Sequence, residues 1–493
     1  MQHIKTLSFL DSLLGKSKTV SVSFSEEETK LYDVVSKMTS TEIKRAIGIS
    51  DINELIRLAE RDYRNVSQTI KVLILQFLKN DNSFISSSDV TFRNSKDIPF
   101  QRWYPYIEGY SPNFVRTLIQ HYVNEKCIIY EPFAGTGTTL FASDSLGYNT
   151  FYSEANPLLR FLIDAKLKVL KLSSNERLIL SDGLNNIVPD LLQFSMPQKE
   201  SLISDYTSAF GRSKYFPDEN FCQILSTATF IDKIKNEVLS NLLKVAVLAS
   251  LIPSSLLKKQ GDLRFKTGKE LKNGVEKFSD VFKRNISVII EDLKNDKYKI
   301  SMKHSCIIEN AKLIGKCNCS KIGCVITSPP YLNGTNYVRN TKLELWFMGT
   351  LKSKQNLRIL RDEMLTSGIN DVKAEYIGND QISGRSQLYD KTIAALKGHA
   401  YDKRIPIMAQ SYFSEMFEIF NSLKEKLLDR SIILIDIGDS VFNNVHIKTD
   451  DILAELFENI GYTYNGKEKL RERRSRNGQI LSQTLLKFTY GKL

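Results

Sequence analysis

The sequence predicts a doubly wound α/β sheet that carries a leading helical segment and a mostly helical insertion. Two apolar stretches rich in β-branched residues, at 127–131 and 324–327, each stop at a loop of glycine, proline and polar residues. Helical and strand-like patterns alternate around both loops, as expected for a parallel sheet with crossover helices. The alternation lapses between about residues 172 and 300, which predicts the insertion. Ligands of such sheets bind at the carboxyl ends of the strands, where both loops lie.

Residues 1–95 form the predicted leading segment. Apolar residues recur on one helical face between residues 31 and 38, and a denser apolar stretch follows at 70–77. Residues 39–59 fit either a helix-turn-helix or an ordinary helical hairpin packed on the next domain. The segment holds no nuclease constellation, so we do not expect a fused restriction enzyme.

The first loop follows the strand at 127–131 and opens a helix. Its glycines, Gly135 and Gly137, let the backbone approach a ligand at the helix N-terminus. The loop lacks the third glycine of the dinucleotide fingerprint and the lysine of the phosphate-binding loop, which argues against NAD and against a nucleoside-triphosphatase. A second strand ends at Glu154, 17 residues after Gly137. A carboxylate at this distance is placed to accept both hydroxyls of a ribose.

The second loop begins at Ser328 and contains two prolines and Tyr331. The prolines have fixed φ angles, which hold the carbonyl oxygens of Ser328 and Pro329 in place. The Tyr331 ring offers a face for stacking. A planar base with an exocyclic amine fits this arrangement, since the oxygens would accept its N–H bonds while the ring holds it flat. A plain strand that ends in a Pro-Pro turn is the alternative interpretation.

Two motifs of the chain resemble those of the amino-methyltransferases that modify DNA at cytosine N4 or adenine N6. They are Phe133-Ala134-Gly135-Thr136-Gly137, similar to the S-adenosylmethionine loop of that family, and Thr327-Ser328-Pro329-Pro330-Tyr331, similar to its catalytic motif. The resemblance extends from about Phe100 to the C-terminus, interrupted by the insertion. It implies an S-adenosylmethionine-dependent methyltransferase with a Rossmann-like sheet.

The resemblance also implies which residues hold the cofactor. Trp103 and Tyr106 would wall its methionine end, although both fit an aromatic-rich entry to the core equally well. Asn310 stands where the family usually has an acid that meets the adenine amine, and its side-chain carbonyl would accept the same hydrogen bond. The expected cofactor-binding residues are Trp103, Tyr106, Pro132, Phe133, Ala134, Gly135, Thr136, Gly137, Thr138, Glu154, Asn156 and Asn310.

The expected catalytic residues are Ser328, Pro329, Pro330 and Tyr331, which would receive a flipped base and localise the lone pair of its amine. A serine before the prolines favours cytosine N4, because family members that act on adenine more often carry Asp or Asn there. Adenine N6 is the runner-up. An RNA or protein amide methyltransferase and a non-catalytic DNA-binding relative are the other classes. The chain has no Pro-Cys dipeptide, which argues against the covalent cysteine route to C5 methylation.

A net charge of +12 and a pI near 9.1 favour a polyanionic partner, here double-stranded DNA. Three segments are candidates for gripping it: a basic connection at 258–266, a flexible excursion at 350–405 and the arginines in a loop before the last strand. The arginines are the expected backbone clamp, and the insertion and the excursion would read the sequence. The expected nucleic-acid contacts are Lys258, Arg264, Arg471, Arg473, Arg474 and Arg476.

The expected organisation is a helical segment at 1–95, a cofactor-binding half at 96–171, the insertion at 172–300 and a catalytic half at 301–493. Six cysteines without a paired framework indicate a reducing cytoplasm, and their spacing does not fit a zinc site, so no metal is expected. The longest apolar run, at 245–253, is too short to span a bilayer, and the N-terminus lacks a signal-peptide pattern. A cognate restriction nuclease, or subunits of a related defence system, would be further partners.

Overall fold

The computed structural model describes most of the chain after residue 87 and two short strands before it. The described residues are 3–7, 20–24, 90–91, 97–106, 109–194, 199–319, 321–332, 336–373, 380, 382–474 and 478–491. The chain divides into two compact units, Met1–Ser87 and Ser88–Leu493. No helix of the described part is long and apolar enough to cross a membrane.

The described part of the first unit is an antiparallel pair of strands, β1 (His3–Leu7) and β2 (Val20–Phe24), in which His3 lies opposite Phe24. The helical prediction for this segment did not include these strands. The predicted helical face at 31–38, the stretch at 70–77 and the helix-turn-helix candidate at 39–59 lie outside the described residues.

The second unit is built on a seven-stranded sheet in the order β12-β13-β9-β8-β3-β4-β7. Its strands are β3 (Ile128–Glu131), β4 (Thr150–Tyr152), β7 (His304–Cys306), β8 (Ile322–Thr327), β9 (Leu427–Gly438), β12 (Tyr462–Arg474) and β13 (Ile480–Tyr490). Neighbouring strands from β7 to β9 pair in parallel, whereas β13 is antiparallel to both β9 and β12. This mostly parallel sheet with crossover helices confirms the predicted doubly wound α/β class.

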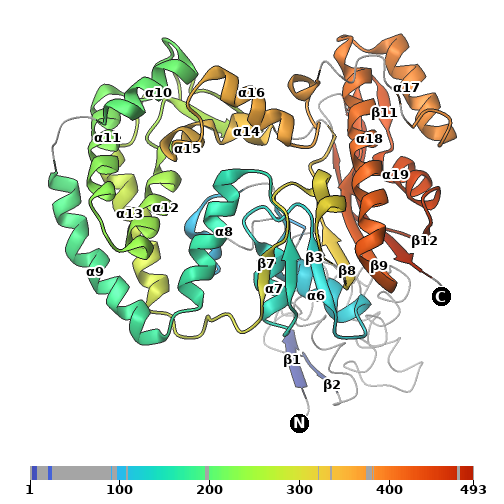
Figure 1. Cartoon of the computed structure of the whole chain (residues 1–493), viewed down its shortest axis with the longest axis horizontal. Coiled ribbons are helices and arrows are strands. Elements are labelled where there is room, and N and C mark those ends of the chain that lie inside the picture. The colour runs from blue at the N-terminus through green and yellow to red at the C-terminus, as the bar shows by residue number, and fades with distance from the viewer. Residues whose placement is uncertain are drawn as a thin grey trace. The chain divides into compact units, whose positions relative to one another are not determined.

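Helices cover the sheet as the alternating pattern predicted. They are α6 (Pro112–Tyr122), α7 (Thr138–Asp144), α8 (Pro157–Leu170), α17 (Gln387–His399), α18 (Arg404–Leu423) and α19 (Thr449–Glu458). Figure 1 shows α18 and α19 beside β9, with α17 next to α18. At the start of α6 the Ser111 hydroxyl accepts the Phe114 N–H at 3.3 Å and Pro112 occupies the first turn, so the predicted N-cap is confirmed.

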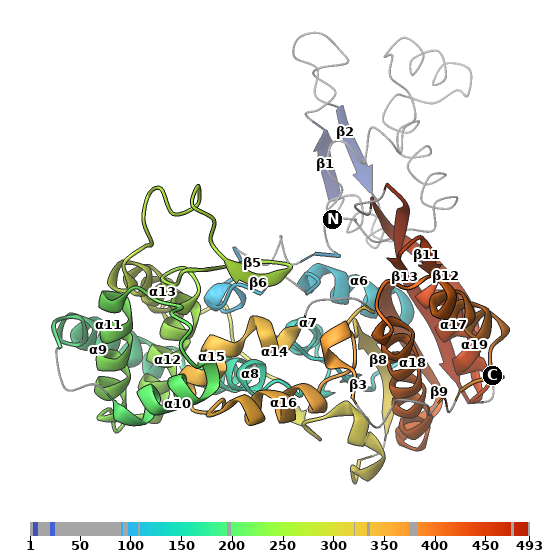
Figure 2. The ribbon, with the colours of Figure 1, turned by 90° about the horizontal axis from the view of Figure 1, so that it is seen from above.

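The insertion is helical, as predicted. Its helices are α9 (Ser174–Gln193), α10 (Glu200–Phe210), α11 (Asp218–Asp232), α12 (Glu237–Leu251) and α13 (Phe278–Leu293). Their core also receives α15 (Lys342–Phe347) from beyond the Ser-Pro-Pro-Tyr turn, and Figures 1 and 2 both show α15 beside α10 and α12. Trp346 of α15 is fully buried, donates its indole N–H to the Leu202 carbonyl at 2.8 Å and stacks on Phe221. The chain after the turn is therefore anchored in the insertion.

The basic connection at 258–266 is not a loop. It is a hairpin of β5 (Leu257–Gln260) and β6 (Asp262–Phe265), whose turn residue Gly261 has a φ of +73°. Leu257 and Leu263 are buried, so the hairpin has an apolar side that the run of charges concealed. Asn340 of α14 (Tyr337–Asn340) holds its tip by accepting the Leu263 N–H at 2.8 Å and donating to the Gly261 carbonyl at 2.7 Å.

The expectation that residues 350–405 form an excursion outside the core is wrong for the described part of that segment. It contains α16 (Lys354–Glu363), a 3₁₀ turn (Ile369–Asp371) and α17. Leu360, Leu365, Tyr389 and Ile393 are buried in the two cores of the unit. A short helix with few apolar residues resembles a loop in sequence. Its few buried residues pack on partners that are distant in the chain, so the local pattern does not reveal that it belongs to the core.

The arginine cluster also differs from the prediction. Arg471, Arg473 and Arg474 lie at the end of the long strand β12, not in a loop, and Arg476 lies outside the described residues. The inner side chains of β12, Glu468 and Leu470, are buried, while polar residues alternate on the outer side. Because so many residues of β12 are polar or charged, the sequence pattern did not predict a strand here.

Candidate functional site

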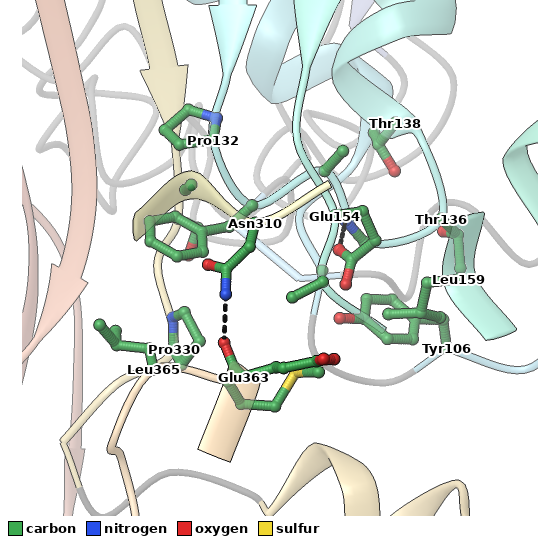
Figure 3. Close-up of a pocket in the computed structure, with 18 of the residues that line it drawn as sticks. Tyr106, Pro132, Thr136, Thr138, Glu154, Leu159, Asn310, Pro330, Glu363 and Leu365 are labelled. Atoms are coloured by element: carbon green, nitrogen blue, oxygen red, sulfur yellow. Dashed lines mark hydrogen bonds between the residues drawn. The ribbon is translucent and has the colours of Figure 1, made fainter. Parts of the chain in front are cut away.

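A pocket opens at the carboxyl ends of the central strands and has a volume of about 810 Å³, its open mouth included. It is lined by residues that the sequence assigned to the cofactor, namely Tyr106, Pro132, Phe133, Ala134, Gly135, Thr136, Thr138, Glu154 and Asn310. Ser328 and Pro330 of the proline turn line the same pocket. Figure 3 shows Pro330 together with residues of the glycine loop. The two predicted motifs, nearly 200 residues apart in the chain, therefore meet in one cavity.

The glycine loop forms one wall of this pocket. Gly135 has a φ of +56°, and a Cβ atom there would lie 3.2 Å from the Tyr106 ring, so a larger residue would be strained and crowded. The Gly135 N–H donates to Glu154 Oε2 at 2.7 Å, and Glu154 Oε1 accepts the Asn156 N–H at 2.8 Å. Burial raises the pKa of Glu154 to about 7. The acid is thus held at the pocket wall by backbone bonds, each of its oxygens retaining acceptor capacity.

Lys166 supports the loop from behind. This fully buried side chain donates from Nζ to the Thr136 carbonyl at 3.0 Å, and burial lowers its pKa to about 7. The Thr136 hydroxyl is itself buried and has no hydrogen-bond partner within the described chain. An unsatisfied hydroxyl in a pocket wall is available to a ligand. Sequence reasoning missed Lys166, whose signal is its position on the buried face of α8, at helical spacing from Ile163 and Leu170.

Glu131 connects the two motifs below the pocket. It accepts Thr327 Oγ1 at 2.5 Å, Thr139 Oγ1 at 2.8 Å and the Phe133 N–H at 3.1 Å, and also bonds the Tyr110 hydroxyl. Burial raises the pKa of Glu131 to about 7. Because Thr327 directly precedes Ser328, this carboxyl sets the position of the proline turn relative to the glycine loop. The sequence feature that indicates a role for Glu131 is its position as an acid at the end of an apolar strand.

Tyr331 is fixed by residues that the sequence did not single out. Its ring lies against Gly438, where a Cβ atom would approach the ring to 2.9 Å. Its hydroxyl accepts Gln483 Nε2 at 2.7 Å, and the same amide donates to both oxygens of Asp436, at 2.7 and 2.9 Å. Burial raises the pKa of Asp436 to about 6. The Ser328 hydroxyl lies 3.5 Å from that of Tyr331. Asp436 and Gly438 do carry a signal, since both interrupt an apolar strand.

Two sets of relatives match this chain along most of its length. The type II methyltransferases M.AvaI of Nostoc sp. and of Anabaena variabilis are each 25% identical to it over an alignment of 466 residues, and the match covers 86% of this chain and 92% of the relative. The type II methyltransferase M.BsoBI of Geobacillus stearothermophilus is 22% identical over an alignment of 443 residues, and the match covers 80% of this chain and 84% of the relative. No family model matches the chain.

The chain is similar to type II methyltransferases. The matches cover 80% or more of the chain and 84% or more of each relative, so the likeness extends well beyond one loop. At this level of identity it supports the methyltransferase class and leaves the modified base open.

Three residues expected at the cofactor do not line the pocket of this methyltransferase-like fold. Trp103 is buried and donates its indole N–H to Asp292 of α13 at 2.9 Å, which fits the core-entry alternative. Gly137, with a φ of +91°, is the N-cap residue of α7, and Asn156 caps α8 by accepting the Leu158 N–H at 3.0 Å. Gly137 and Asn156 therefore lie at the N-termini of α7 and α8, and the loops that precede these helices line the pocket. Trp103 instead joins the segment before α6 to α13 of the insertion.

Pro329 and Tyr331 of the expected catalytic set also lie outside the pocket lining. Pro329 is buried within the turn, and Tyr331 lies behind it against Gly438. Asn310 does line the pocket, but its carbonyl oxygen already accepts the Lys312 N–H at 3.0 Å and its amide donates to the Glu363 carbonyl at 2.8 Å.

The predicted DNA-binding residues are dispersed and mostly engaged. Lys258 and Arg264 both pair with Glu270, at 2.7 and 2.8 Å, so this one carboxylate partly offsets the basic charge of the hairpin. Arg471 donates to the side-chain carbonyl of Gln483 at 2.5 Å and so belongs to the group that holds Tyr331. Arg473 and Arg474 are exposed beyond it.

Proposed function

We propose that this protein is a site-specific DNA methyltransferase that transfers a methyl group from S-adenosylmethionine to the exocyclic N4 amine of cytosine. The observation that carries the proposal is the meeting of the glycine loop and the Ser-Pro-Pro-Tyr turn in one pocket. Similarity to type II methyltransferases supports methyl transfer, and the net charge of +12 supports a DNA substrate.

The residues of the pocket fit S-adenosylmethionine, which supplies an electrophilic methyl group on a sulfonium. Glu154 retains acceptor capacity for the ribose hydroxyls. The Thr136 hydroxyl has no partner within the described chain and lies in the wall where a polar ligand group would pass. Tyr106 faces the glycine loop so closely that only glycine fits at position 135 without crowding. These groups bind and orient the ligand before any chemistry.

The target base would enter from the side of the proline turn. Ser328 and the Pro329 carbonyl would accept the amine N–H bonds, which localises the lone pair that attacks the methyl group. The new N–C bond replaces the S–C bond of the sulfonium, S-adenosylhomocysteine leaves, and the amine gives up one of its protons. The group formed by Tyr331, Asp436, Gln483 and Gly438 keeps the turn from shifting. Since the reacting atoms must be held within a few tenths of an ångström, such positioning supplies much of the rate enhancement.

The decisive experiment identifies the methylated nucleoside. Purified protein is incubated with duplex DNA and S-adenosylmethionine labelled in the methyl group, and the DNA is digested to nucleosides. We expect label in N4-methylcytosine. Label in N6-methyladenine would show that adenine, not cytosine, is the modified base. Label in RNA but not in DNA would refute the assignment of DNA as the substrate. A Tyr331→Ala variant that still binds cofactor serves as the inactive control.

We also propose that methylation by this protein marks DNA for a cognate restriction nuclease or a related defence system. The class of the relatives, type II methyltransferase, motivates this role. Plasmid DNA isolated from cells that express the protein would then resist a nuclease of the matching recognition sequence, whereas DNA from cells with the Tyr331→Ala variant would be cut.

A further inference from the structure

The segment 362–371, at the end of α16, borders the candidate pocket. Glu363, Met364 and Leu365 line the same cavity as the glycine loop. Figure 3 shows Glu363 and Leu365 together with Asn310 and Pro330 on one side of the pocket, opposite Tyr106 and Leu159. This segment belongs to the region that the sequence placed outside the core.

Residues of the pocket wall hold the start of the segment. Asn310 donates to the Glu363 carbonyl at 2.8 Å, and Lys312 Nζ donates to the Met364 carbonyl at 2.6 Å and to the Asp362 carbonyl at 3.2 Å. These carbonyls belong to the last turn and the cap of α16, where intrahelical partners are missing. A positive charge is favourable at a helix C-terminus, so Lys312 is suited to this cap.

The rest of the segment is held from two further directions. The Thr366 N–H donates to the buried Glu415 of α18 at 2.7 Å. Asp371 accepts the Gly368 N–H at 3.0 Å and Asn336 Nδ2 at 2.7 Å. Asn336 follows Tyr331 by five residues, so the segment joins the pocket wall to the chain that carries the proline turn.

The position of the segment indicates which part of a ligand it would meet. Glu154, the expected ribose acceptor, follows β4, and Asn310 follows the neighbouring strand β7. Met364 and Leu365 line the same pocket and directly follow Glu363, whose carbonyl Asn310 binds, so they border the pocket beside Asn310 and Ala311. These aliphatic and thioether groups suit the face of a flat heterocycle, since methionine sulfur makes favourable contacts with aromatic rings. The carboxylate of Glu363 lies at the exposed mouth.

We infer that the segment 362–371 is a strap that binds the nucleoside end of the cofactor, with Met364 packing on its base. This inference rests on the proposed function, because it takes the ligand to be an adenosine derivative. Met364 would then contribute to cofactor affinity without touching the target base or the transferred methyl group.

The test uses S-adenosylhomocysteine, which is not consumed, and measures its affinity by calorimetry. Met364→Ala should bind it about tenfold more weakly than the unaltered protein, as expected for the loss of one apolar contact. Ile359→Ala is the matched control, because Ile359 lies on the same helix and is 49% exposed. Equal affinity in Met364→Ala and the unaltered protein would overturn the strap.

A second measurement needs no variant. Hydrogen exchange of the unaltered protein should slow at the amides of 364–371 when S-adenosylhomocysteine is added, as well as in the glycine loop. Protection of the glycine loop with unchanged exchange in the strap would refute the inference and leave the proposed function intact. Failure of the unaltered protein to bind S-adenosylhomocysteine would instead refute the proposed function, and the strap assignment with it.

Discussion

Glu154 shows how a single side chain can prepare a pocket for its ligand. Both of its oxygens accept backbone N–H bonds, which fix the carboxyl, while burial raises its pKa to about 7. The charged form accepts hydrogen bonds from hydroxyls more strongly than the neutral form. Ligand binding at this acid is therefore linked to its loss of a proton.

The first prediction concerns this linkage. Cofactor binding favours deprotonated Glu154, so affinity should rise between pH 6 and pH 8, by up to about tenfold per pH unit below the pKa. Glu154→Gln cannot ionise, and we expect it to bind S-adenosylhomocysteine about tenfold more weakly at pH 8 and with less pH dependence. Calorimetry at pH 6, 7 and 8 measures both effects. Parallel pH profiles for the two proteins would contradict the role of Glu154.

The second prediction concerns Gly438, whose missing side chain makes room for Tyr331. A Cβ atom there would lie 2.9 Å from the ring, so Gly438→Ala must displace Tyr331 and the proline turn. A misplacement of about 1 Å can cost about a hundredfold in rate. We expect methyl transfer to fall by about that factor while cofactor affinity stays within about twofold.

Gly398→Ala is the control for this substitution, because a Cβ atom there meets no other group within 4 Å. Methyl transfer assays and calorimetry on the same preparations separate the two readouts. A parallel loss of cofactor binding in Gly438→Ala would show that Tyr331 acts through the cofactor pocket and not on the target base.

At the scale of elements, α8 carries a buried charge beneath the glycine loop. Lys166 has a pKa of about 7 in the folded protein, whereas a lysine in an unfolded chain titrates near pH 10.4. Between these values the unfolded state binds about one proton more than the folded state through this group. Its contribution to stability therefore rises with pH, by about 1.4 kcal/mol per pH unit.

The third prediction follows from this difference. The free energy of unfolding of the unaltered protein should rise more steeply between pH 7.5 and pH 9.0 than that of Lys166→Met. Urea denaturation at the two pH values measures the slopes. Lys168→Met is the control on the same helix, because Lys168 is partly exposed and pairs with Glu237 at the surface. Equal slopes in the unaltered protein and Lys166→Met would show that Lys166 stays charged when buried.

The end of β12 offers a second test at this scale, because its arginines are not equivalent. Arg471 bonds Gln483 in the group that holds Tyr331, whereas Arg473 and Arg474 are exposed. The strand fixes the position of the exposed pair, and guanidinium groups suit phosphate oxygens. We therefore assign the backbone clamp to Arg473 and Arg474 and a positioning role to Arg471.

The fourth prediction tests that division. Arg473→Ala combined with Arg474→Ala should weaken binding to all DNA sequences alike and reduce the salt dependence of log K by roughly one to two units of slope. Lys258→Ala is the comparison, because Lys258 pairs with Glu270 and should change the slope less. Binding titrations at several salt concentrations measure the slopes. An altered recognition sequence with an unchanged slope would make the arginines readers of bases.

At the scale of the molecule, the insertion and the sheet are joined through the chain that follows the proline turn. Trp346 lies in the core of the insertion, and Asn340 holds the tip of the β5–β6 hairpin. DNA bound by the insertion or the hairpin would therefore be mechanically connected to the turn that receives the base. The proposed DNA substrate and the net charge of +12 are consistent with such an extended contact.

The sequence by itself determined the fold class and the two loops of the site. A β-branched strand that ends in Pro-Pro-Tyr or in a glycine turn is a local feature, since backbone geometry at glycine and proline depends on few neighbours. The cap at Ser111 and the helical insertion were also predictable from local patterns. Other residues of the pocket lining, such as Tyr106 and Asn310, were expected from the resemblance to the DNA amino-methyltransferases.

Only the tertiary structure decided which distant groups complete the site. Trp103 packs on Asp292, Glu131 bonds Thr327, Asp436 and Gln483 hold Tyr331, and Met364 borders the pocket. Each of these contacts joins residues far apart in the chain. The sequence indicates that a residue is suited to burial. It does not indicate which partner the residue contacts, because that depends on how the elements pack. The segment 350–405 and the strand β12 were misjudged for this reason.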